Sequence, residues 1–553
     1  METYLQYRRI GRTIQRQLES ADGVSARNLP CLSRQKTRVV NGESILIVEW
    51  DGPDDPLNPR NWSLFRRLSA TFIISSIAFM VGAAAPIDAA VLPQAARDLG
   101  VSEVTETLAV GIFLIGFGAG ALICGPFSEV LGRSGTYMVS LIFMCIWLMA
   151  SALAPNIGAQ IVFRFLAGFS GASPLVCAGG SVSDMFTPIE KTYVFPLFAF
   201  GGFLGPPLGP VMAAWVPGSP YLHTWRWAEW IALFTAAVVL LSAFFFQPET
   251  FPPLLLSWKA RHLRRITGDK RYYAEHEIER IPLSTRLRVA LPRPFIMAFT
   301  EPVIFLITLY MSVLYIILFT FFDGYDFIFR ETYGLSQGMS NTIFLGIAVG
   351  VCFGGAWLPW MYTMTQRAQA AAEARGQKQF DPEIRLWFAM LGGAPAIPVS
   401  LLWMGWTAYP SVSIWSPILA SVLSGYGTIM IFISCYMYII DSYEMYAASA
   451  LTFATLARYI IAGGMTVAGV PFYKNLGVHW TLTILAALSA VLAPLPYVFY
   501  KYGYVIRRKS RFAVSRAAED EIVPVQDESS GSSAVTITPE KNQDLVDRPV
   551  TIK

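Results

Sequence analysis

Twelve apolar runs of about twenty residues recur along the chain, and they limit its fold more than any other feature. The first set lies near residues 68–92, 104–124, 136–154, 158–182, 192–215 and 228–246. The second set lies near residues 299–322, 340–361, 384–406, 412–440, 446–470 and 479–500. A helix needs about 20 mostly apolar residues to cross a hydrocarbon core about 30 Å thick. Charged residues make up only 14% of the 553, against about a quarter in soluble proteins. The pattern predicts an all-α membrane protein with twelve transmembrane helices.

Basic residues concentrate in alternate loops. The segment before Leu68, residues 247–297, the loop after residue 361 and the C-terminal tail each carry several Lys and Arg. The loops near residues 155, 218–224 and 407–411 carry almost none. Because cytoplasmic loops of membrane proteins are enriched in Lys and Arg, we expect both termini in the cytoplasm. Asn61, in an Asn-Trp-Ser acceptor pattern, would then be cytoplasmic and stay unglycosylated.

Several function classes lack their sequence signatures. The formal net charge is only +4, which does not indicate nucleic-acid binding, and the six cysteines show no CxxC spacing. Neither a disulfide framework nor a metal site is therefore expected. The chain has no G-x-x-x-x-G-K-[ST] motif for ATP and no catalytic grouping of its four histidines. We expect no cofactor, no metal and no enzymatic activity.

The spans divide into two groups of six around a polar loop. The organisation we predict is a cytoplasmic tail at 1–67, a six-helix bundle at 68–246, a central loop at 247–297, a second bundle at 298–502 and a disordered cytoplasmic tail at 503–553. Two pseudo-symmetric bundles of this kind place a substrate site near the midplane between them. The loop can form a basic amphipathic helix on the inner membrane face. The stretch EWDGPDDPLNPRNWS, residues 49–63, is either an ordered loop or a disordered lead-in.

The stretch GGFLGPPLGPVMAAW, residues 201–215, places helix-weakening residues inside an apolar run. In lipid, backbone groups freed by Pro or Gly must be satisfied within the protein. Small residues also let helices approach closely. We therefore expect a bent helix face packed against another helix. Ordinary small-residue packing is the alternative.

The spacing of this stretch resembles the fifth-helix signature of the proton-coupled drug antiporters of the major facilitator superfamily. The matching residues are Gly201, Gly205, Pro206, Gly209 and Pro210. They lie in the fifth predicted span, where that family places its motif, although Ala213 and Ala214 replace the trailing glycines. In the family the motif is associated with export. The resemblance implies a bent, tightly packed helix that keeps the closed bundle from leaking.

The segment GPFSEVLGRSG, residues 125–135, is similar to the superfamily signature of the loop between spans two and three. Gly125 and Gly132 are expected to permit a tight turn. Glu129 and Arg133 supply charges that can pair across the cytoplasmic mouth when the halves close. Ser134 departs from the pattern, because the family usually has a second basic residue there.

Asp184 ends the fourth span on the cytoplasmic side, where the loop that carries Arg133 also lies. We therefore expect Asp184 near Arg133. Together with Glu129 the two residues would form a charge cluster that latches one conformation.

Other segments resemble those of fungal drug and polyamine exporters, and the resemblance covers roughly residues 48–510. These segments are DGPDDPLNPRNWS, RFLAGFSGASPLVCAGGSVSDMF, QPET with KARHLRRITGD, and DSYEMYAASALTFATLARYIIAG.

Two charged residues inside predicted spans are candidates for proton coupling. Arg164 lies within the fourth run, where a charge costs at least about 2.5–3.5 kcal/mol and needs a cavity or a partner. The resemblance implies a part in proton coupling for Arg164, and the alternative is a structural arginine. Asp88 is the only acid of the first span, and burial would suit it to reversible protonation. It can equally contact a cationic substrate or be a wetted residue at the outer rim. For Arg458, in span eleven, we expect a structural role.

The predicted function is secondary active export of small amphipathic organic molecules by exchange for protons. Drugs, toxins or secondary metabolites are the expected substrates. A polyamine exporter, or a proton-coupled importer or facilitator of a small nutrient, is the alternative. The expected partners are the small-molecule substrate, protons and the lipid bilayer, with no nucleic acid, and the chain is expected to be a monomer. The plasma membrane is the expected location, with the vacuolar membrane as the alternative.

Overall fold

In the computed structural model, the described residues are 1–20, 37–40, 43–222, 224–278, 283–377, 380–508, 510 and 512–513. Residues Met1–Ala513 form one compact unit. The first residues of the predicted disordered tail, 503–508, belong instead to the helix Leu495–Arg508, and the tail lies outside the described residues from Val514 onward.

Eleven helical segments of the described chain are long and apolar enough to cross a membrane. They are Leu64–Leu99, Glu103–Leu131, Arg133–Ala152, Ile157–Met185, Pro188–Ala213, Trp227–Phe246, Pro302–Thr332, Gln337–Glu373, Pro382–Thr407, Trp415–Tyr443 and Ala447–Arg508. The last segment has 62 residues, which would be about 93 Å long as one straight helix. That is about three times the hydrocarbon thickness of a bilayer.

This last segment turns back on itself at Gly477. The backbone there leaves the helical conformation, with φ 76° and ψ 169°. Just after the turn, His479 contacts the carbonyl oxygen of Gly405, and further on Tyr497 donates a hydrogen bond of 3.2 Å to the carbonyl oxygen of Met390. The second part therefore runs antiparallel to the ninth span. The segment contains two spans, which confirms the predicted all-α fold with twelve transmembrane helices.

The first six spans of the described chain consist of nine helical elements. These are α2 (Leu64–Ala84), η4 (Ile87–Val91), α3 (Leu92–Leu99), α4 (Glu103–Leu131), α5 (Arg133–Ala152), α6 (Ile157–Gly171), α7 (Ser173–Met185), α8 (Pro188–Ala213) and α9 (Trp227–Phe246). Side chains that cap the amino ends explain where several of these helices begin. Ser63, Ser102 and Asn156 each accept a hydrogen bond from a backbone amide three residues on, and Thr187 forms a capping box with Glu190.

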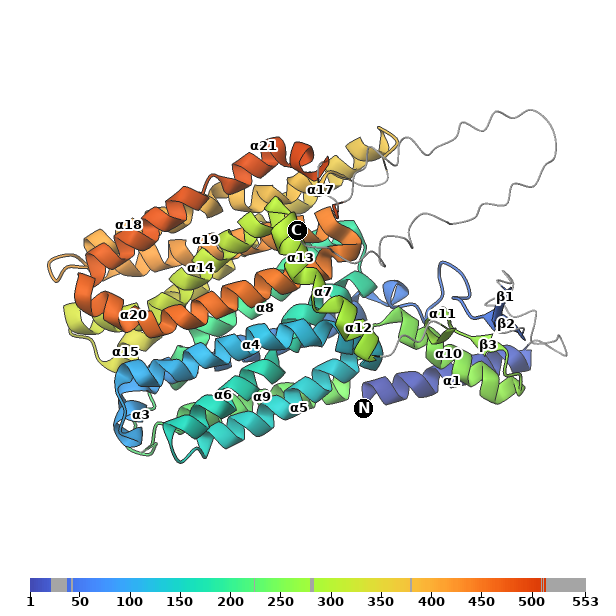
Figure 1. Ribbon diagram of the computed structural model, residues 1–553, viewed down its shortest axis with the longest axis horizontal. Helices are drawn as coiled ribbons and strands as arrows, with labels where there is room; N and C mark the ends of the chain where they lie inside the picture. Colours follow the sequence, from blue (N-terminus) through green and yellow to red (C-terminus); the bar gives the residue numbers. More distant parts are fainter. Residues whose placement is uncertain are drawn as a thin grey trace, which may run out of the picture. The chain divides into compact units, whose positions relative to one another are not determined.

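The second six spans are more often interrupted. Their elements are α14 (Pro302–Tyr325), η5 (Asp326–Thr332), α15 (Gln337–Thr342), α16 (Leu345–Gly354), η6 (Gly355–Trp357), α17 (Leu358–Glu373), η7 (Pro382–Leu386), η8 (Ala389–Gly393), α18 (Ala394–Thr407), α19 (Trp415–Tyr443), η9 (Glu444–Tyr446), α20 (Ala447–Leu492) and α21 (Leu495–Arg508). In Figure 1 the spans lie roughly parallel, with α1, α10 and the strands at one end and α3 and α15 at the other. We call these the central-loop end and the far end.

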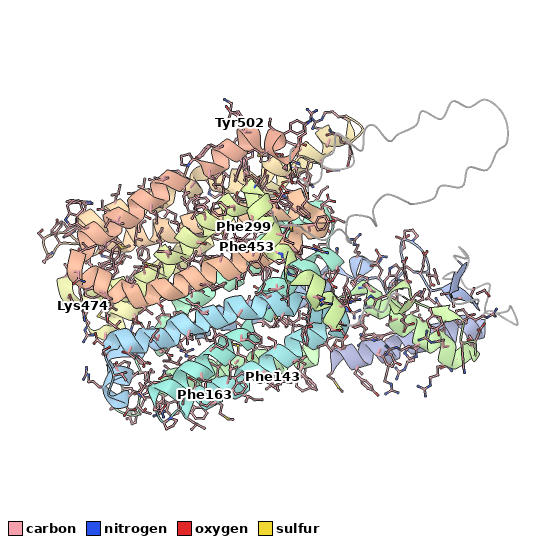
Figure 2. The ribbon with its side chains drawn as sticks, in the orientation of Figure 1. Phe143, Phe163, Phe299, Phe453, Lys474 and Tyr502 are labelled. Carbon is pink, nitrogen blue, oxygen red and sulfur yellow. The ribbon has the colours of Figure 1, made fainter. Side chains whose placement is uncertain are left out.

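The outer surface of the bundle carries large apolar side chains. Phe143, Phe299 and Tyr502, which are labelled in Figure 2, are all exposed. Soluble proteins rarely expose contiguous apolar surface on this scale. This surface fits contact with lipid, whereas the side chains of Arg164, Arg385 and Arg458 are buried inside the bundle.

The N-terminal segment and the central loop pack into one small subdomain. Its elements are α1 (Glu2–Ser20), β1 (Thr37–Val40), β2 (Glu43–Ile47), α10 (Pro252–Thr267), β3 (Tyr272–Tyr273) and α11 (Glu275–Ile278). Three further short elements, η3 (Pro59–Asn61), α12 (Leu283–Ala290) and α13 (Arg293–Thr300), contact α7, α4 and α20 of the bundle, respectively. The sheet order is β1-β2-β3, with β1 antiparallel and β3 parallel to β2. Ile10 and Ile14 of α1 share a core with Leu255 and Leu263 of α10. The expected amphipathic helix is thus α10, whose apolar face is covered by protein.

The acidic stretch 49–63 is an ordered loop in this subdomain. Lys259 of α10 is buried, and its Nζ atom lies 2.8 Å from Oδ1 of Asp51 and 3.2 Å from Oδ2 of Asp55. Asp55 also accepts hydrogen bonds from the backbone amides of Asp51 and Leu57. This ion pair links two regions that are about 200 residues apart in the chain, and it settles the alternative that the sequence left open.

Candidate functional site

Arg164 is completely buried on α6, at a point where α6 packs tightly against α4. A Cβ atom on Gly116 or Gly120 of α4 would overlap the carbonyl oxygen of Phe165 or Phe169. Glycine at these positions lets the two backbones approach this closely. The guanidinium also lies over the ring of Phe113, 5.5 Å from its centroid.

Two carboxylates from other spans meet this guanidinium. Asp88 of η4 forms an ion pair with Arg164 and accepts a hydrogen bond of 2.7 Å from its Nε atom. Glu229, at the start of α9, places Oε1 3.0 Å from the same Nε atom. The Nη1 group donates to the carbonyl oxygen of Ala84 at 2.7 Å. The structure therefore brings together Arg164 and Asp88, the two residues predicted for proton coupling.

A third buried acid completes this carboxyl cluster, which we define as Asp88, Glu106 and Glu229 around Arg164. Glu106 is 1% exposed and accepts a hydrogen bond of 3.0 Å from Nε2 of Gln160. Each of the three acids has one buried oxygen without a hydrogen-bond partner among the described residues. The sequence analysis did not single out Glu106 or Glu229. Their position inside the second and sixth apolar runs was the signal that could have found them.

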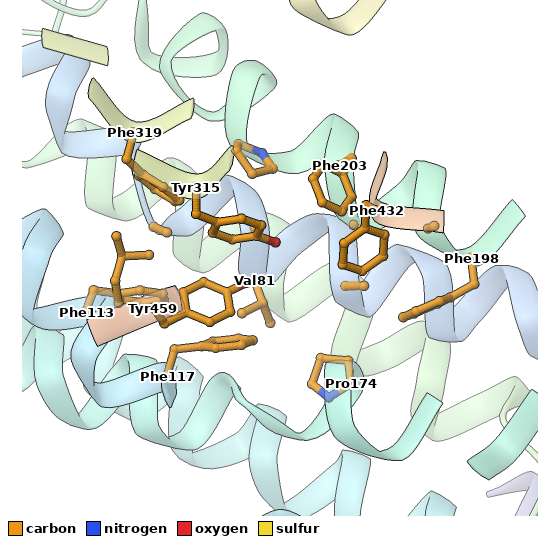
Figure 3. Close-up of a pocket in the computed structure, with 17 residues that line it drawn as sticks. Val81, Phe113, Phe117, Pro174, Phe198, Phe203, Tyr315, Phe319, Phe432 and Tyr459 are labelled. Atoms are coloured by element: carbon orange, nitrogen blue, oxygen red, sulfur yellow. The ribbon is translucent and has the colours of Figure 1, made fainter. Parts of the chain in front are cut away.

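A small cavity lies between the two groups of spans. Its volume is about 30 Å³, well below the volume of about 150 Å³ of an apolar cavity that holds benzene. Eight of its 17 lining residues (Figure 3) are aromatic side chains from both halves: Phe113, Phe117, Phe198, Phe203, Tyr315, Phe319, Phe432 and Tyr459. Figure 3 shows these rings, with the Tyr315 hydroxyl pointing into the cavity. The remaining wall consists of Ala, Val, Gly, Leu and Pro, so this cavity has a flat, apolar lining.

The glycine–proline helix forms part of this wall. Gly202 and Pro206 of α8 line the cavity. On another side of α8, Cβ atoms on Gly201, Gly205 and Gly209 would overlap Ser75, Phe79 and Ala83 of α2. Pro210 is buried in the same helix, which continues unbroken to Ala213. The predicted close packing against another helix is therefore observed.

At the central-loop end, Arg133 begins α5 and lies next to Asp184 of α7. Its Nε atom is 3.3 Å from Oδ2 of Asp184, and its Nη1 group donates to Oγ of Ser128 at 2.6 Å. Glu129 pairs with Arg286 of α12, at 3.0 Å. The expected cluster thus contains two of its three members, because the central loop supplies a different partner for Glu129.

The turn between α4 and α5 is made by Gly132 alone. Gly132 has φ 84°, a conformation that favours glycine. Gly125 lies inside α4 instead, so the turn expected there is wrong. Oxygen atoms of the buried Glu249 accept hydrogen bonds from the backbone amides of Arg133, at 2.9 Å, and Ser134, at 3.2 Å. Glu249 therefore caps the amino end of α5.

Burial raises the pKa of Glu249 to about 7, although amide donors including Phe251 and Arg133 oppose the shift. The sequence analysis used Glu249 only as part of the QPET resemblance. Its role as a cap depends on the return of the chain after the sixth span, which sequence spacing did not reveal.

Arg385 joins the two halves at the same end. It is fully buried in η7, and its Nε atom donates to Oδ2 of Asp441 at 2.6 Å. Its Nη1 and Nη2 groups donate to Oγ1 of Thr192 and, at 3.1 Å, to the carbonyl oxygen of Pro188, both on α8. One arginine of the second half thus contacts the start of the fifth span. The sequence analysis counted Arg385 only as a loop charge.

Polar contacts also bridge the halves at the far end. Nε2 of Gln337 donates to the carbonyl oxygen of Ala90 at 2.9 Å, and Gln94 donates to Gln337 at 2.9 Å. Lys474 of α20 lies 3.6 Å from Glu103 of α4. Contacts between the halves at both ends leave the central cavity closed in this conformation.

A wider cavity of about 360 Å³ lies at the far end, outside these contacts. Acidic side chains dominate its polar lining, which contains Glu103, Asp323, Asp326, Arg330, Glu331 and Lys474. Ala89, next to Asp88 in the chain, also lines it. The cavity thus reaches the residue that follows Asp88 in the chain, while Asp88, Glu106 and Glu229 themselves are not among its lining residues. The described residues hold no group of three or more His, Cys, Asp or Glu side chains suited to a metal ion.

Known proteins resemble this chain along most of its length. The MFS-type transporter kojT of Aspergillus flavus is 48% identical over 472 residues, which cover 85% of this chain and 83% of that protein. Efflux pump atB of Aspergillus terreus is 34% identical, with 85% and 90% covered. Among solved structures, the proton:xylose symporter XylE bound to 6-bromo-6-deoxy-D-glucose has a TM-score of 0.58 at 12% sequence identity. The match covers 80% of this chain and 96% of that one, and it supports the fold alone. The family model described as Major Facilitator Superfamily matches residues 68–466, and the chain belongs to this superfamily of membrane transporters.

Proposed function

We propose that this transporter exports small amphipathic organic molecules in exchange for protons, by alternating access. The observation that carries the proposal is the buried carboxyl cluster around Arg164. Intramembrane ionisable residues mark ion and substrate pathways in transporters.

The charges of the cluster do not balance when all groups are ionised. Asp88, Glu106 and Glu229 would carry three negative charges against the single positive charge of Arg164, and all four side chains are at most 1% exposed. Burying unpaired charge is expensive, and a proton on a carboxyl group removes that cost. The cluster therefore suits the uptake and release of at least one proton in each cycle.

The position of the cluster suits proton entry from the far end. Asp88 precedes Ala89, which lines the acidic far-end cavity. With both termini in the cytoplasm, as the distribution of Lys and Arg predicts, the far end faces outward. Protons would then reach the cluster from outside, and their passage inward would drive the outward movement of substrate.

The closed central cavity fits an occluded step of this cycle. A volume of about 30 Å³ is well below the volume of about 150 Å³ of a cavity that holds benzene, so the two halves must separate to admit an organic substrate. The contacts of Arg385 at one end and of Gln337 at the other would break in alternation. Such contacts would set the rates of opening at each end.

Export is favoured over import by the glycine–proline helix α8, through its resemblance to antiporters, and by the printed name of the relative atB, an efflux pump. The lining of the central cavity contains no acid, which disfavours the polyamine alternative because polyamines carry several positive charges. We propose the plasma membrane as the location and a monomer as the working form. The vacuolar membrane is the alternative location.

The proposal is tested by uptake into inside-out vesicles that contain the full chain, under an imposed pH gradient and with a panel of labelled organic compounds. Uptake should follow an acidic interior and should stop when an ionophore collapses the gradient. Vesicles with Arg164→Ala protein at equal abundance serve as the control. Uptake driven by ATP, or uptake indifferent to the gradient, would contradict proton exchange. Uptake only in right-side-out vesicles would favour the importer alternative.

A further inference from the structure

Three arginines of the described chain are fully buried, and one of them has no anionic partner. Arg164 pairs with Asp88 and Glu229, and Arg385 pairs with Asp441. No carboxylate among the described residues pairs with Arg458, and none of its three guanidinium nitrogens has a hydrogen-bond partner there. The structural role expected from the sequence leaves this charge without a counterion.

Aromatic rings surround the guanidinium of Arg458 on α20. Its central carbon lies 4.6 Å from the ring centroid of Tyr315, 5.0 Å from Tyr459, 5.1 Å from Tyr436 and 5.5 Å from Phe432. These rings come from α14, α19 and α20. They hold the guanidinium in one place by face contacts and interact electrostatically with it, but none of these side chains is an anion.

Face contacts offset part of the cost of burying this charge but do not neutralise it. Each of the four cation–π contacts contributes about 0.5–2 kcal/mol, against an effective penalty of several kcal/mol for burying an ion, and the site still carries an unbalanced positive charge. Guanidinium groups bind carboxylates through two parallel hydrogen bonds, and such bonds are roughly twice as strong as neutral ones. A bound anion is the group that would complete this site.

The site adjoins the central cavity. Tyr315, Phe432 and Tyr459 contact Arg458 with one part of their rings and also line the cavity. Phe203 from the other half lies 4.4 Å from Phe432, and Phe117 lies 4.5 Å from Tyr459, centroid to centroid. Figure 3 shows these rings facing one another across the cavity. Small shifts of Tyr315 or Phe432 would open the guanidinium to the cavity.

We propose that Arg458 binds the negatively charged oxygen atoms of a small planar organic acid, whose ring stacks between the aromatic walls of the central cavity. The charge of Arg458 selects an anion and repels cations, and the cavity lining contains no carboxylate that would pair with a cationic substrate. Flat walls from Phe117, Phe203 and Phe432 select a flat ring, since aromatic pairs stack or meet edge to face. This proposal gives a substrate class to the transporter and therefore rests on the proposed function.

Binding is tested on the purified full chain without any gradient, by titration with three probes that share one ring. Benzoate carries a negative charge, benzamide is neutral and benzylamine carries a positive charge. Benzoate should raise the melting temperature of the wild-type protein in a saturable way, and the other two should not. Acetate at equal ionic strength controls for general salt effects. Stabilisation by benzamide or benzylamine equal to that by benzoate, or none by benzoate, would overturn the proposal.

Variants locate the charge that binds the probe. Arg458→Gln should weaken benzoate binding at least roughly thirtyfold. Arg458→Lys should lie between wild type and Arg458→Gln, because lysine keeps the charge without the planar fork. Arg265→Gln, at an exposed arginine of α10, is the matched control and should bind as wild type. Unchanged benzoate binding by Arg458→Gln would assign Arg458 a structural role only.

Two further measurements test the anion site if Arg458→Gln protein does not fold and separate anion binding from proton exchange. If Arg458→Gln protein does not fold, Phe432→Leu should weaken benzoate binding while leaving the response to acetate unchanged, and an unchanged benzoate affinity there would refute the stacked site. Binding without a gradient is independent of transport. Benzoate binding that depends on Arg458, combined with uptake indifferent to pH, would refute proton exchange and leave the anion site standing.

Discussion

The Nε atom of Arg164 lies 3.0 Å from Oε1 of Glu229, and both side chains are fully buried inside the first six spans. The same nitrogen donates to Asp88 at 2.7 Å. One cation thus joins the first, fourth and sixth spans. A proton that arrives on either acid weakens its hold on Arg164, so protonation is linked to the packing of three helices.

Arg164→Ala should abolish transport driven by a pH gradient. Without the guanidinium, no positive charge offsets the negative charge that proton release would leave in the buried cluster, so release becomes more costly. The protein should still reach the membrane, since neutral acids in this place are tolerated. Initial rates of uptake into vesicles, normalised to protein abundance, measure the effect. Arg164→Lys keeps the charge and should retain partial activity, and wild-type rates in Arg164→Ala would remove Arg164 from the mechanism.

Gly205→Ala should destabilise the bundle by about 1–3 kcal/mol, the usual range for overpacking. The added methyl group would overlap the carbonyl oxygen of Phe79, so α8 and α2 would have to separate. Gly202→Ala is the matched control in the same helix, because its methyl group would lie 3.8 Å from Cβ of Ala78 in ordinary contact. Melting temperatures of the two purified variants provide the comparison. Equal melting temperatures would show that α8 does not need its close approach to α2.

The free energy of unfolding should decrease between pH 5 and pH 7 because of the titration of Glu249. Burial raises the pKa of this carboxyl from 4.5 in the unfolded chain to about 7 in the folded protein. Below both values the group is protonated in both states, and its contribution is fully present. As the pH rises toward 7, the unfolded chain loses the proton first, so folding loses about 3 kcal/mol in total. Above pH 7 the loss stays constant.

Glu249→Gln should remove this component of the pH dependence, because glutamine does not titrate. The difference in melting temperature between wild type and variant, followed from pH 5 to pH 8, reports it. A difference that does not change with pH would mean that Glu249 has the same pKa in both states.

Lys259→Ala should unfold the small subdomain locally. Removal of one partner of a buried ion pair costs about 3–5 kcal/mol, and the Asp55 side chain, which is 1% exposed, would lose its only cation among the described residues. Faster hydrogen exchange in residues 49–63 and in α10 is the expected result. Arg261→Ala is the control, since its side chain is 48% exposed and lies 3.6 Å from Glu277. Equal exchange in the two variants would contradict a stabilising role for the Lys259 pair.

The spans were predictable because the requirement for a membrane helix is local. Twenty apolar residues in sequence satisfy it whatever surrounds them, and the one merged segment still divides at Gly477. Arg164 and Asp88 stood out for a related reason, since any charge inside an apolar run needs a partner. The close packing of α8 also followed from residue type, because Gly201, Gly205 and Gly209 repeat every fourth position on one helix face.

Partners were much less predictable, because a partner depends on which helices become neighbours. Glu129 and Arg133 lie in one motif, yet the first pairs with Arg286 and the second with Asp184. From the sequence, Arg385 was predicted to be one of the basic residues of a cytoplasmic loop. In the folded chain it is buried against the fifth span.

By itself, the sequence determined twelve spans, their order and the positions where charge enters the membrane, because hydropathy and residue size act along a single helix. Only the tertiary structure decided that Glu106 and Glu229 join Asp88 around one arginine and that Arg458 stays without a counterion beside an aromatic cavity. Those features arise from distances between helices far apart in the chain, and hydropathy and spacing along one span do not specify such distances.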